Sequence, residues 1–291
     1  MRISELLKRE GVTFSLEVFP PKTSDRYTQT AAAAKEIAAL KPDFMSVTYG
    51  AGGGTGTFTA GIASEIQAEF GVPTLAHLTC VSSSREHVLN MLHTYREKGI
   101  ENILALRGDR PADGAISTDY RYAVELVRDI RAHGDFCIGG ACYPEGHVEC
   151  AHKSEDIRHL KEKVDAGLDF LTTQMFFSND IFYNFLYRAR EAGIDVPIIP
   201  GIMPITTARQ LGRSVAMSGT DVPQALRAIV DHFGETPAAM AQAGIVYATE
   251  QIVDLLANGI RHIHVYTMNK PEVAARIMAN LSVILGRDHE A

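Results

Sequence analysis

Short apolar segments alternate with longer amphipathic segments along the whole chain. Each apolar segment ends in polar or glycine-rich positions, as buried parallel strands do. The strand-like segments cover residues 14–20, 44–50, 73–80, 102–109, 136–145, 170–177, 196–204 and 262–268. Between them, as in residues 84–99 and 119–134, apolar residues recur at three- and four-residue spacing and glycine stands near the end. These intervening segments therefore predict amphipathic helices.

Alternating strands and helices predict a (β/α)8 TIM barrel, the simplest closed form of a parallel sheet with this many strands. The last interval is long, and residues 206–260 predict extra helices before the last strand. No proline- or serine-rich linker divides the chain, so we expect residues 1–291 to form one catalytic barrel domain. An open doubly wound sheet is the alternative, but no G-x-G-x-x-G fingerprint follows the first strand.

Composition and charge narrow the classes of function. The chain is 46% hydrophobic and 22% charged, its formal net charge is −7, and it has no lysine or arginine block. A nucleic-acid-binding surface is therefore not expected. No apolar run approaches the ~20 residues that cross a bilayer, and residues 1–11 lack the apolar core of a secretion signal. We expect a cytoplasmic protein whose cysteines, which lack C-x-x-C spacing, are reduced thiols.

Polar residues gather where the predicted strands end, the position of catalytic groups in such barrels. They are Glu17, Thr48, Tyr49, His77, Thr79, Arg107, Asp109, Tyr143, Glu145, His147, Gln174, Tyr266, Asn269 and Lys270. We expect these side chains to converge on one face of the barrel. Glu17 stands out because it interrupts an otherwise apolar strand, and the pattern alone allows either a structural or a catalytic carboxylate.

Two further motifs allow more than one interpretation. Residues 50–56, GAGGGTG, resemble an anion cradle before a helix that begins near Thr57, but a flexible turn is equally compatible and no G-K-[ST] follows. His147, Cys150 and His152 suggest zinc only superficially, because no second ligand cluster completes a site. We predict no metal.

The sequence Arg107-Gly108-Asp109 places a cation and a carboxylate on either side of a residue without a side chain. It predicts either an ion pair at the barrel rim or a flat cofactor lying against Gly108 with charged groups at its edges. In the second case Glu17 and Asp109 would be two carboxylates with separate roles on one face.

Seven motifs in this order resemble the methylenetetrahydrofolate reductases of the bacterial single-domain type. They are FSLEVFPPK (14–22), SVTYGAGG (46–53), AHLTC (76–80), LALRGD (104–109), YPEGH (143–147), TTQMFF (172–177) and IIPGIMP (198–204). The resemblance implies a (β/α)8 barrel that holds FAD noncovalently. It also implies reduction of 5,10-methylenetetrahydrofolate to 5-methyltetrahydrofolate, with NADH or NADPH as electron donor.

The same resemblance assigns roles to individual residues. Glu17 matches the general acid that helps to open the folate ring to a 5-iminium cation, and Asp109 matches a carboxylate near both flavin and pterin. Positions that match flavin contacts are Thr48, Tyr49, Ala51, His77, Arg107, Gly108, Asp109, Tyr122, Ala123, Tyr143, His147, Cys150, Asp156, His159 and Lys163. Positions that match substrate contacts are Glu17, Asp109, Gln174, Gln210 and Lys270. An acid acting near neutral pH needs a raised pKa, which burial of Glu17 among apolar residues can provide.

Some positions depart from the family pattern. Ser214 stands where relatives carry a ligand-stacking aromatic ring, Lys270 stands where they often carry arginine, and Cys150 and His159 replace commoner residues. The alternative function is therefore a flavin-carrying subunit that takes electrons from a partner protein. A barrel of the proline-dehydrogenase type is a third hypothesis, which Glu17 and the LRGD strand disfavour. We expect a homo-oligomer.

Overall fold

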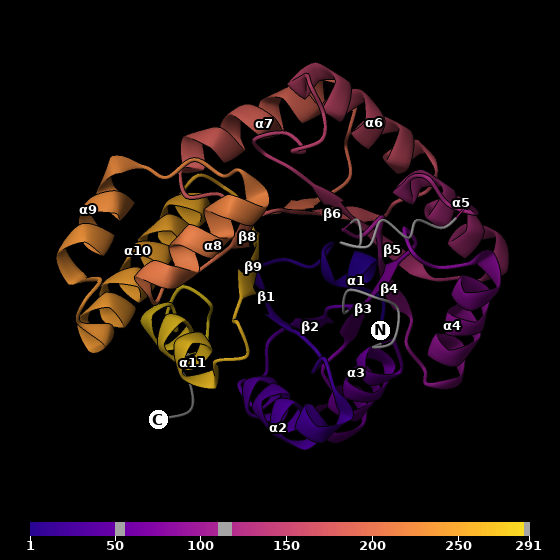
Figure 1. Cartoon of the computed structure of the whole chain (residues 1–291), viewed down its shortest axis with the longest axis horizontal. Helices are drawn as coiled ribbons and strands as arrows, with labels where there is room; N and C mark the ends of the chain where they lie inside the picture. The colour runs from indigo at the N-terminus through magenta and orange to yellow at the C-terminus, as the bar shows by residue number, and fades with distance from the viewer. Residues whose placement is uncertain (50–55, 110–117, 288–291) are drawn as a thin grey trace.

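The computed structural model describes residues 1–49, 56–109 and 118–287, and its strands form one parallel sheet that curls into a nearly closed barrel (Figure 1). The strands are β1 (Thr13–Val18), β2 (Phe44–Val47), β3 (Thr74–Thr79), β4 (Asn102–Leu106), β5 (Cys137–Cys142), β6 (Phe170–Thr173), β7 (Ile198–Ile199), β8 (Gly201–Ile202) and β9 (His262–Tyr266). Their order in the sheet is β7-β6-β5-β4-β3-β2-β1-β9-β8. The predicted barrel is confirmed.

The predicted seventh strand is broken into β7 and β8 by Pro200. β7 pairs with β6, whereas β8 pairs with β9. Proline has no N–H with which to continue a ladder, but the Pro200 carbonyl still accepts the N–H of His264 at 3.0 Å. The nine segments thus correspond to the eight predicted strands, and the break lies where the barrel closes.

Helices surround the barrel and cover its outer face. They are α2 (Tyr27–Ala38), α3 (Gly56–Phe70), α4 (Arg85–Glu97), α5 (Ala123–His133), α6 (Lys153–Asp165), α7 (Asn179–Glu191), α8 (Ala208–Ser218), α9 (Gln224–Phe233), α10 (Pro237–Ala257) and α11 (Pro271–Asn280), with a short 3₁₀ turn η1 (Ser24–Arg26). The remaining helix, α1 (Ile3–Leu6), lies at one end of the barrel. The helices α8, α9 and α10 between β8 and β9 are the predicted extra helices, and they form the orange group in Figure 1.

The strands end earlier than the apolar runs suggested. The run at 170–177 predicted a strand to residue 177, but β6 ends at Thr173. Phe176 and Phe177 are buried beyond the strand end, and the Phe176 ring stacks on Phe182 of α7 at 5.3 Å. An apolar run cannot distinguish a strand from a buried loop, which is why the prediction was too long.

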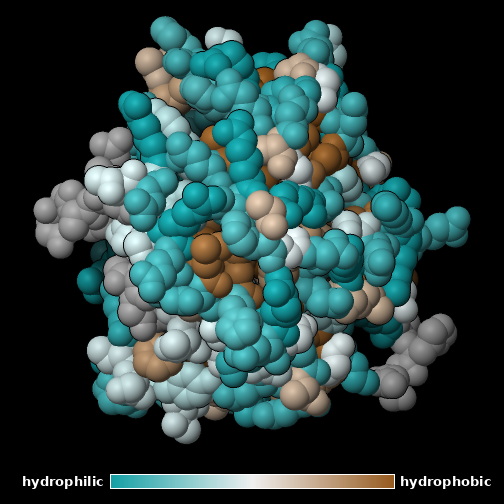
Figure 2. All heavy atoms as spheres, turned by 90° about the vertical axis from the view of Figure 1, so that its right-hand side faces the viewer, coloured by the Kyte–Doolittle hydropathy of each residue, from teal (hydrophilic) through white to brown (hydrophobic). Residues whose placement is uncertain are grey.

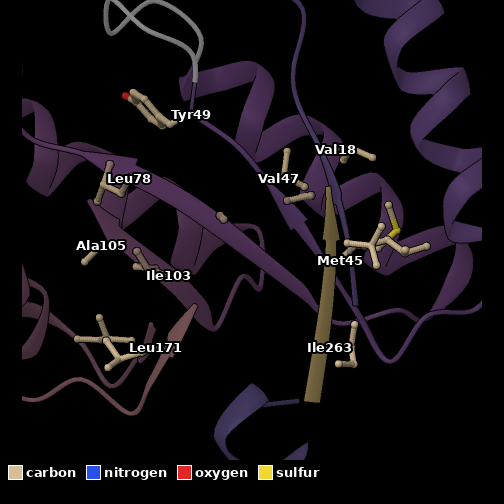
Figure 3. Packing of buried hydrophobic residues seen from close by; sticks show 14 of the residues in the cluster. Val18, Met45, Val47, Tyr49, Leu78, Ile103, Ala105, Leu171 and Ile263 are labelled. Atoms are coloured by element: carbon tan, nitrogen blue, oxygen red, sulfur yellow. The ribbon is translucent and has the colours of Figure 1, made fainter. Parts of the chain in front are cut away.

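Successive side chains of β1 point alternately toward the helices and into the barrel. Phe14, Leu16 and Val18 belong to the large apolar cluster between strands and helices, where Val18 lies opposite Val47 of β2 (Figure 3). Ser15 and Glu17 therefore point to the opposite side, into the barrel. The inner face of one strand thus carries a hydroxyl and a carboxylate.

The N-terminal end of the barrel is filled by α1. Ile3 and Leu6 pack with inward residues such as Phe44 and Phe170 at the starts of their strands, and the Ile3 N–H donates to Asn102 Oδ1 at 2.8 Å. Because this end is packed with apolar side chains, the polar residues lie at the opposite, C-terminal end.

The surface is mostly hydrophilic, with small separate apolar areas on the face that Figure 2 shows. None of the helices in the described ranges has the length and apolar character needed to span a bilayer. The four cysteines are free thiols, and Cys80, Cys137 and Cys142 are buried.

Candidate active site

Glu17 lies inside the barrel, and its carboxylate is contacted by three side chains, from β2, β3 and β9. Ser46 Oγ of β2 donates to Glu17 Oε2 at 3.2 Å. Nε2 of His264 in β9 lies 3.4 Å from the same oxygen, and Nε2 of His77 in β3 lies 3.6 Å from it. Strand pairing brings them together, because Glu17 is in register with Ser46 on one side and Tyr266 on the other. The Glu17 side chain is 17% exposed.

A second set of contacts fixes these partners. Ser46 Oγ lies 2.6 Å from His77 Nε2, and Ser15 Oγ lies 2.9 Å from His264 Nδ1 while donating to the Ile263 carbonyl at 3.0 Å. The two imidazoles are nearly inaccessible to solvent. The carboxylate is therefore part of a buried network whose geometry is set by strand backbones.

The network around Glu17 opposes the rise in pKa that burial alone would cause. Burial raises the pKa of Glu17, but the hydrogen bond from His264, the nearby imidazoles and the Ser46 hydroxyl together lower it below its ordinary value. The sequence showed the apolar flank but not the hydrogen-bond donors on adjacent strands, and it is these donors that determine the direction of the shift.

His77 makes the stability of the protein sensitive to acid. Burial lowers the pKa of His77 to about 4, from 6.5. Between pH 6.5 and pH 4, His77 is therefore protonated in the unfolded chain but neutral in the folded chain. The free energy of unfolding consequently decreases as pH falls through that window. We expect a loss of about 3 kcal/mol from this group, measured as the pH-dependent difference in unfolding free energy between wild type and His77→Gln.

His93→Gln is the matched control for this measurement, because the His93 side chain on α4 is 68% exposed. The exposed ion pair with Glu97 at 3.1 Å that this variant removes contributes little to stability, so its unfolding free energy should stay close to that of wild type. A difference between wild type and His77→Gln that stays constant from pH 6.5 to pH 4 would contradict the assignment.

Arg107 and Glu149 form a two-point ion pair at the end of β4. Arg107 Nη1 donates to Glu149 Oε2 at 2.9 Å and Nη2 donates to Oε1 at 2.5 Å, while Nε donates to the Gly108 carbonyl at 3.3 Å. The pair joins β4 to the segment between β5 and α6, and the Glu149 carboxylate raises the pKa of Arg107. The guanidinium is therefore fixed in orientation, as bidentate pairs are.

The residues after β5 and on α6 add aromatic and charged groups to the same rim. Tyr143 and His147 meet edge to face, with ring centroids 4.6 Å apart, and Lys163 Nζ donates to the Ala141 carbonyl at 2.7 Å. Burial raises the pKa of Tyr143 to about 12, and the nearby Asp109 adds to the rise. Burial also lowers the pKa of Lys163.

Tyr122 and His159 stack at 6.5 Å, joining the start of α5 to α6. Ala123 is the first residue of α5 and is buried. Asp156 lies in the first turn of α6, and burial raises its pKa. Cys150 is half-buried, and its thiol donates to the His152 carbonyl at 3.4 Å. The described ranges contain no group of three or more His, Cys, Asp or Glu arranged to hold a metal.

Other predicted flavin positions contribute backbone or lie elsewhere. Gly108 has φ +87°, and a Cβ there would lie 3.0 Å from Thr79 Cβ, so the position requires glycine. The Tyr49 hydroxyl is 3.0 Å from His87 Nε2 of α4, which turns its ring into the layer between strands and helices. The Thr48 N–H donates to the Val18 carbonyl at 3.0 Å. Ala51 lies outside the described residues.

Three predicted substrate residues lie around the ends of β6, β8 and β9. Lys270 Nζ donates to Thr206 Oγ1 at 2.8 Å, and the same hydroxyl donates to Gln210 Oε1 at 3.1 Å. Thr206 therefore joins Lys270 to Gln210. Gln174 Oε1 accepts its neighbour's N–H, that of Met175, at 2.9 Å.

Asp109 and Ser214 differ in their surroundings. Asp109 is exposed just after β4, and no hydrogen bond or ion pair of the Glu17 carboxylate within the described ranges involves it. Ser214 is 8% exposed, on the buried side of α8 with Leu211. The residue that replaces the stacking ring therefore offers little surface to a ligand.

Sequence reasoning missed the partners that hold the predicted residues. Ser46, His264 and Ser15 surround Glu17, Glu149 pairs with Arg107, and Thr206 joins Lys270 to Gln210. Side chains two residues apart on a strand point to the same face. Ser15 and His264 could therefore have been identified from the sequence, since they lie two residues before Glu17 and Tyr266. Nothing local marks Glu149 or Thr206.

Comparisons with known proteins extend over nearly the whole chain. The family described as Methylenetetrahydrofolate reductase matches residues 2–282. Methylenetetrahydrofolate reductase (NADH) 1 of Arabidopsis thaliana is 37% identical over 298 residues, which cover 97% of this chain and 50% of the relative. The 5,10-methylenetetrahydrofolate reductase of Pectobacterium carotovorum is 36% identical over 281 residues, covering 97% of this chain and 93% of the relative. The chain thus spans about half the length of the plant relative.

Solved structures share the fold at low sequence identity. An uncharacterized protein from Clostridium thermocellum that binds two copies of 5-methyl-5,6,7,8-tetrahydrofolic acid has a TM-score of 0.65 at 14% identity, covering 98% of this chain and 100% of that one. Oxaloacetate acetylhydrolase has a TM-score of 0.56 at 13% identity, covering 99% and 86%. These similarities show the barrel alone, whereas the family match rests on the sequence from residue 2 to residue 282. The chain belongs to the methylenetetrahydrofolate reductase family.

Proposed function

We propose that this protein is a flavin-dependent oxidoreductase that reduces 5,10-methylenetetrahydrofolate to 5-methyltetrahydrofolate. The observation that carries the proposal is the Glu17 carboxylate, held inside the barrel by Ser46 and His264 in a chain of this family. A structural carboxylate would need only enough partners to satisfy it. This one is contacted by Ser46, His264 and His77 and also keeps a partly exposed face at the end of the barrel where ligands bind.

FAD is the cofactor that we propose, and the rim formed by β4, β5 and α6 carries groups suited to it. Arg107, whose guanidinium is held in orientation by Glu149, supplies a cation suited to a diphosphate, and Tyr122 stacked on His159 supplies an exposed planar surface. Glu145 Oε1 is buried and has no hydrogen-bond partner within the described ranges. An unsatisfied acceptor of this kind is costly unless a ligand donates to it.

Bound FAD would supply the hydride transfer, which amino-acid side chains cannot perform. The chain itself would position the folate and deliver a proton. Glu17 would donate that proton to the folate nitrogen that leaves the methylene bridge, and folate covering its exposed face would raise the lowered pKa of Glu17 by further desolvation. Ser46 and His264 would hold the carboxyl in place before and after the transfer.

Gln174, Gln210 and Lys270 would hold the rest of the folate. The Lys270 ammonium suits the carboxylates of a glutamate tail, and Thr206 fixes its position at 2.8 Å. An ammonium binds such a group as a point charge and without the two-point geometry of arginine.

NADH or NADPH would be the electron donor. The Arabidopsis thaliana relative is named as an NADH enzyme, but Ser214 provides no stacking ring. This departure supports a second candidate function, a flavin-carrying subunit that receives electrons from a partner protein. A cytoplasmic location and a homo-oligomeric state stay predictions.

Purified protein reconstituted with FAD should be yellow, and 5,10-methylenetetrahydrofolate should reoxidise its dithionite-reduced flavin anaerobically, with 5-methyltetrahydrofolate as product. Stopped-flow spectroscopy checks this step independently of the donor. A protein that does not retain FAD, or whose reduced flavin is unaffected by the folate, would refute the proposal. Rapid bleaching by NADH alone would exclude the need for a partner protein.

A further inference from the structure

The chain takes an unusual backbone conformation where β9 ends beside β1. Met268 and Asn269 both have φ of +54°, consecutive left-handed residues without glycine. This conformation costs roughly 1–2 kcal/mol per residue for ordinary side chains, and less for asparagine. The β9–β1 ladder has its last register pair at Glu17 and Tyr266, so the strained turn begins just beyond the residue opposite Glu17.

The Asn269 side chain makes hydrogen bonds to the residue after β1, beyond the point where the backbone pairing of β9 with β1 ends. Its Oδ1 accepts the Phe19 N–H at 2.9 Å, and its Nδ2 donates to the Phe19 carbonyl at 2.9 Å. A carboxamide has the same donor and acceptor as a peptide group, so it can replace one. Pro20 and Pro21 follow and have no N–H, which makes Phe19 the last residue of this segment that can donate.

Thr267 connects this pairing to Glu17 itself. Thr267 Oγ1 donates to the Glu17 carbonyl at 2.6 Å and accepts the Asn269 N–H at 3.2 Å. The carbonyl of Glu17 and both backbone groups of Phe19 are therefore held by two side chains of the same short turn. The left-handed conformation at residues 268 and 269 places the carboxamide where it can reach Phe19.

We propose that Asn269 is a positioning residue for Glu17, clamping the end of β1 so that the carboxyl meets the folate nitrogen at the correct distance. This inference rests on the proposed function, because it takes Glu17 as the proton donor. Asn269 does not touch the reacting atoms in this arrangement and acts only through the backbone of residues 17–19.

Asn269→Gly tests the clamp, because glycine accepts the left-handed backbone and removes only the carboxamide. In FAD-loaded protein reduced with dithionite, we expect the limiting rate of reoxidation by 5,10-methylenetetrahydrofolate to fall about tenfold or more. The folate concentration at half-maximal rate should change by less than about twofold, since substrate contacts are kept. Asn269→Asp, which keeps the acceptor and loses the donor, should give an intermediate rate and carries the test if the glycine variant does not fold.

Met268→Gly is the matched control, since it loosens the same turn and leaves the carboxamide in place. We expect its rate to stay within about twofold of wild type. A wild-type rate in Asn269→Gly and Asn269→Asp would overturn the clamp, and so would equal losses in Asn269→Gly and Met268→Gly. Failure of the wild-type protein to react with the folate would instead refute the proposed function, and the role of Asn269 with it.

Discussion

Replacing Glu17 by Gln is expected to slow folate reduction about 10²–10⁴-fold, the usual contribution of a positioned general acid. The amide has nearly the shape of the carboxyl, so the network of Ser46, His77 and His264 should remain folded around it. It cannot give up a proton at neutral pH. The expected loss is therefore confined to the step in which the folate nitrogen is protonated.

The half-reactions separate this role from a structural one. Flavin reduction by dithionite or NADH should be unchanged in Glu17→Gln, whereas reoxidation by 5,10-methylenetetrahydrofolate should collapse. Glu65→Gln is a suitable control, because Glu65 on α3 is a partly buried carboxylate with its own partners, Tyr27 at 2.7 Å and Lys35 at 3.1 Å. Equal loss of both half-reactions in Glu17→Gln would contradict the acid role.

The pH dependence gives a second test of the same residue. In wild type the folate reaction should slow as pH rises through the pKa of Glu17 in the folate complex, because the protonated form is the reactive one. Glu17→Gln should lose that dependence along with the rate. If the folate reaction of the variant still slows with rising pH as in wild type, a group other than Glu17 is responsible for the titration.

The outer layer of the fold could be predicted from sequence because it depends on local pattern. Phe14, Leu16 and Val18 alternate with polar positions, and that alternation fixes which side of β1 faces the helices. The break at Pro200 was visible as a proline but not as the closure of the barrel, since closure depends on which strands pair with β7 and β8.

The candidate site could be predicted only in part, because its energetics depend on residues distant in sequence. Glu17 was recognisable as a carboxylate in an apolar strand. The direction of its pKa shift was not, because the groups that lower it come from positions 46, 77 and 264. Arg107 likewise was recognisable by position, while its partner Glu149 lies 42 residues away. Family resemblance locates the functional positions, and strand pairing supplies the partners that determine their charge.

Gly244→Ala is expected to destabilise the fold by at least about 2–3 kcal/mol, at the upper end of overpacking effects. Gly244 lies in α10, where the helix meets the segment after β8. A Cβ at this position would lie 1.7 Å from the Ile205 carbonyl oxygen and 2.7 Å from its carbon. These are backbone atoms, so a side-chain rotation cannot relieve the clash and either α10 or the segment must shift.

The shift should also reach Lys270 and Gln210, which we propose as folate contacts. Thr206, the residue after Ile205, accepts a hydrogen bond from the Lys270 ammonium and donates one to Gln210. Displacing Thr206 should therefore misplace Lys270 and Gln210 and weaken folate binding even in folded molecules. Gly212→Ala in α8 is the matched control, because its Cβ would meet nothing within 4 Å. Alanine there should stabilise the helix by about 0.5–1 kcal/mol.

Urea unfolding of the two variants measures their difference in free energy of unfolding, provided that the dependence of that free energy on urea concentration is the same as in wild type. Opposite shifts in midpoint are expected, downward for Gly244→Ala and upward for Gly212→Ala, although both replace a helical glycine by the best helix former. Propensity alone would favour both substitutions. A midpoint for Gly244→Ala at or above wild type would therefore mean that α10 can move away from Ile205 without cost, and that the close contact does not fix the position of Thr206.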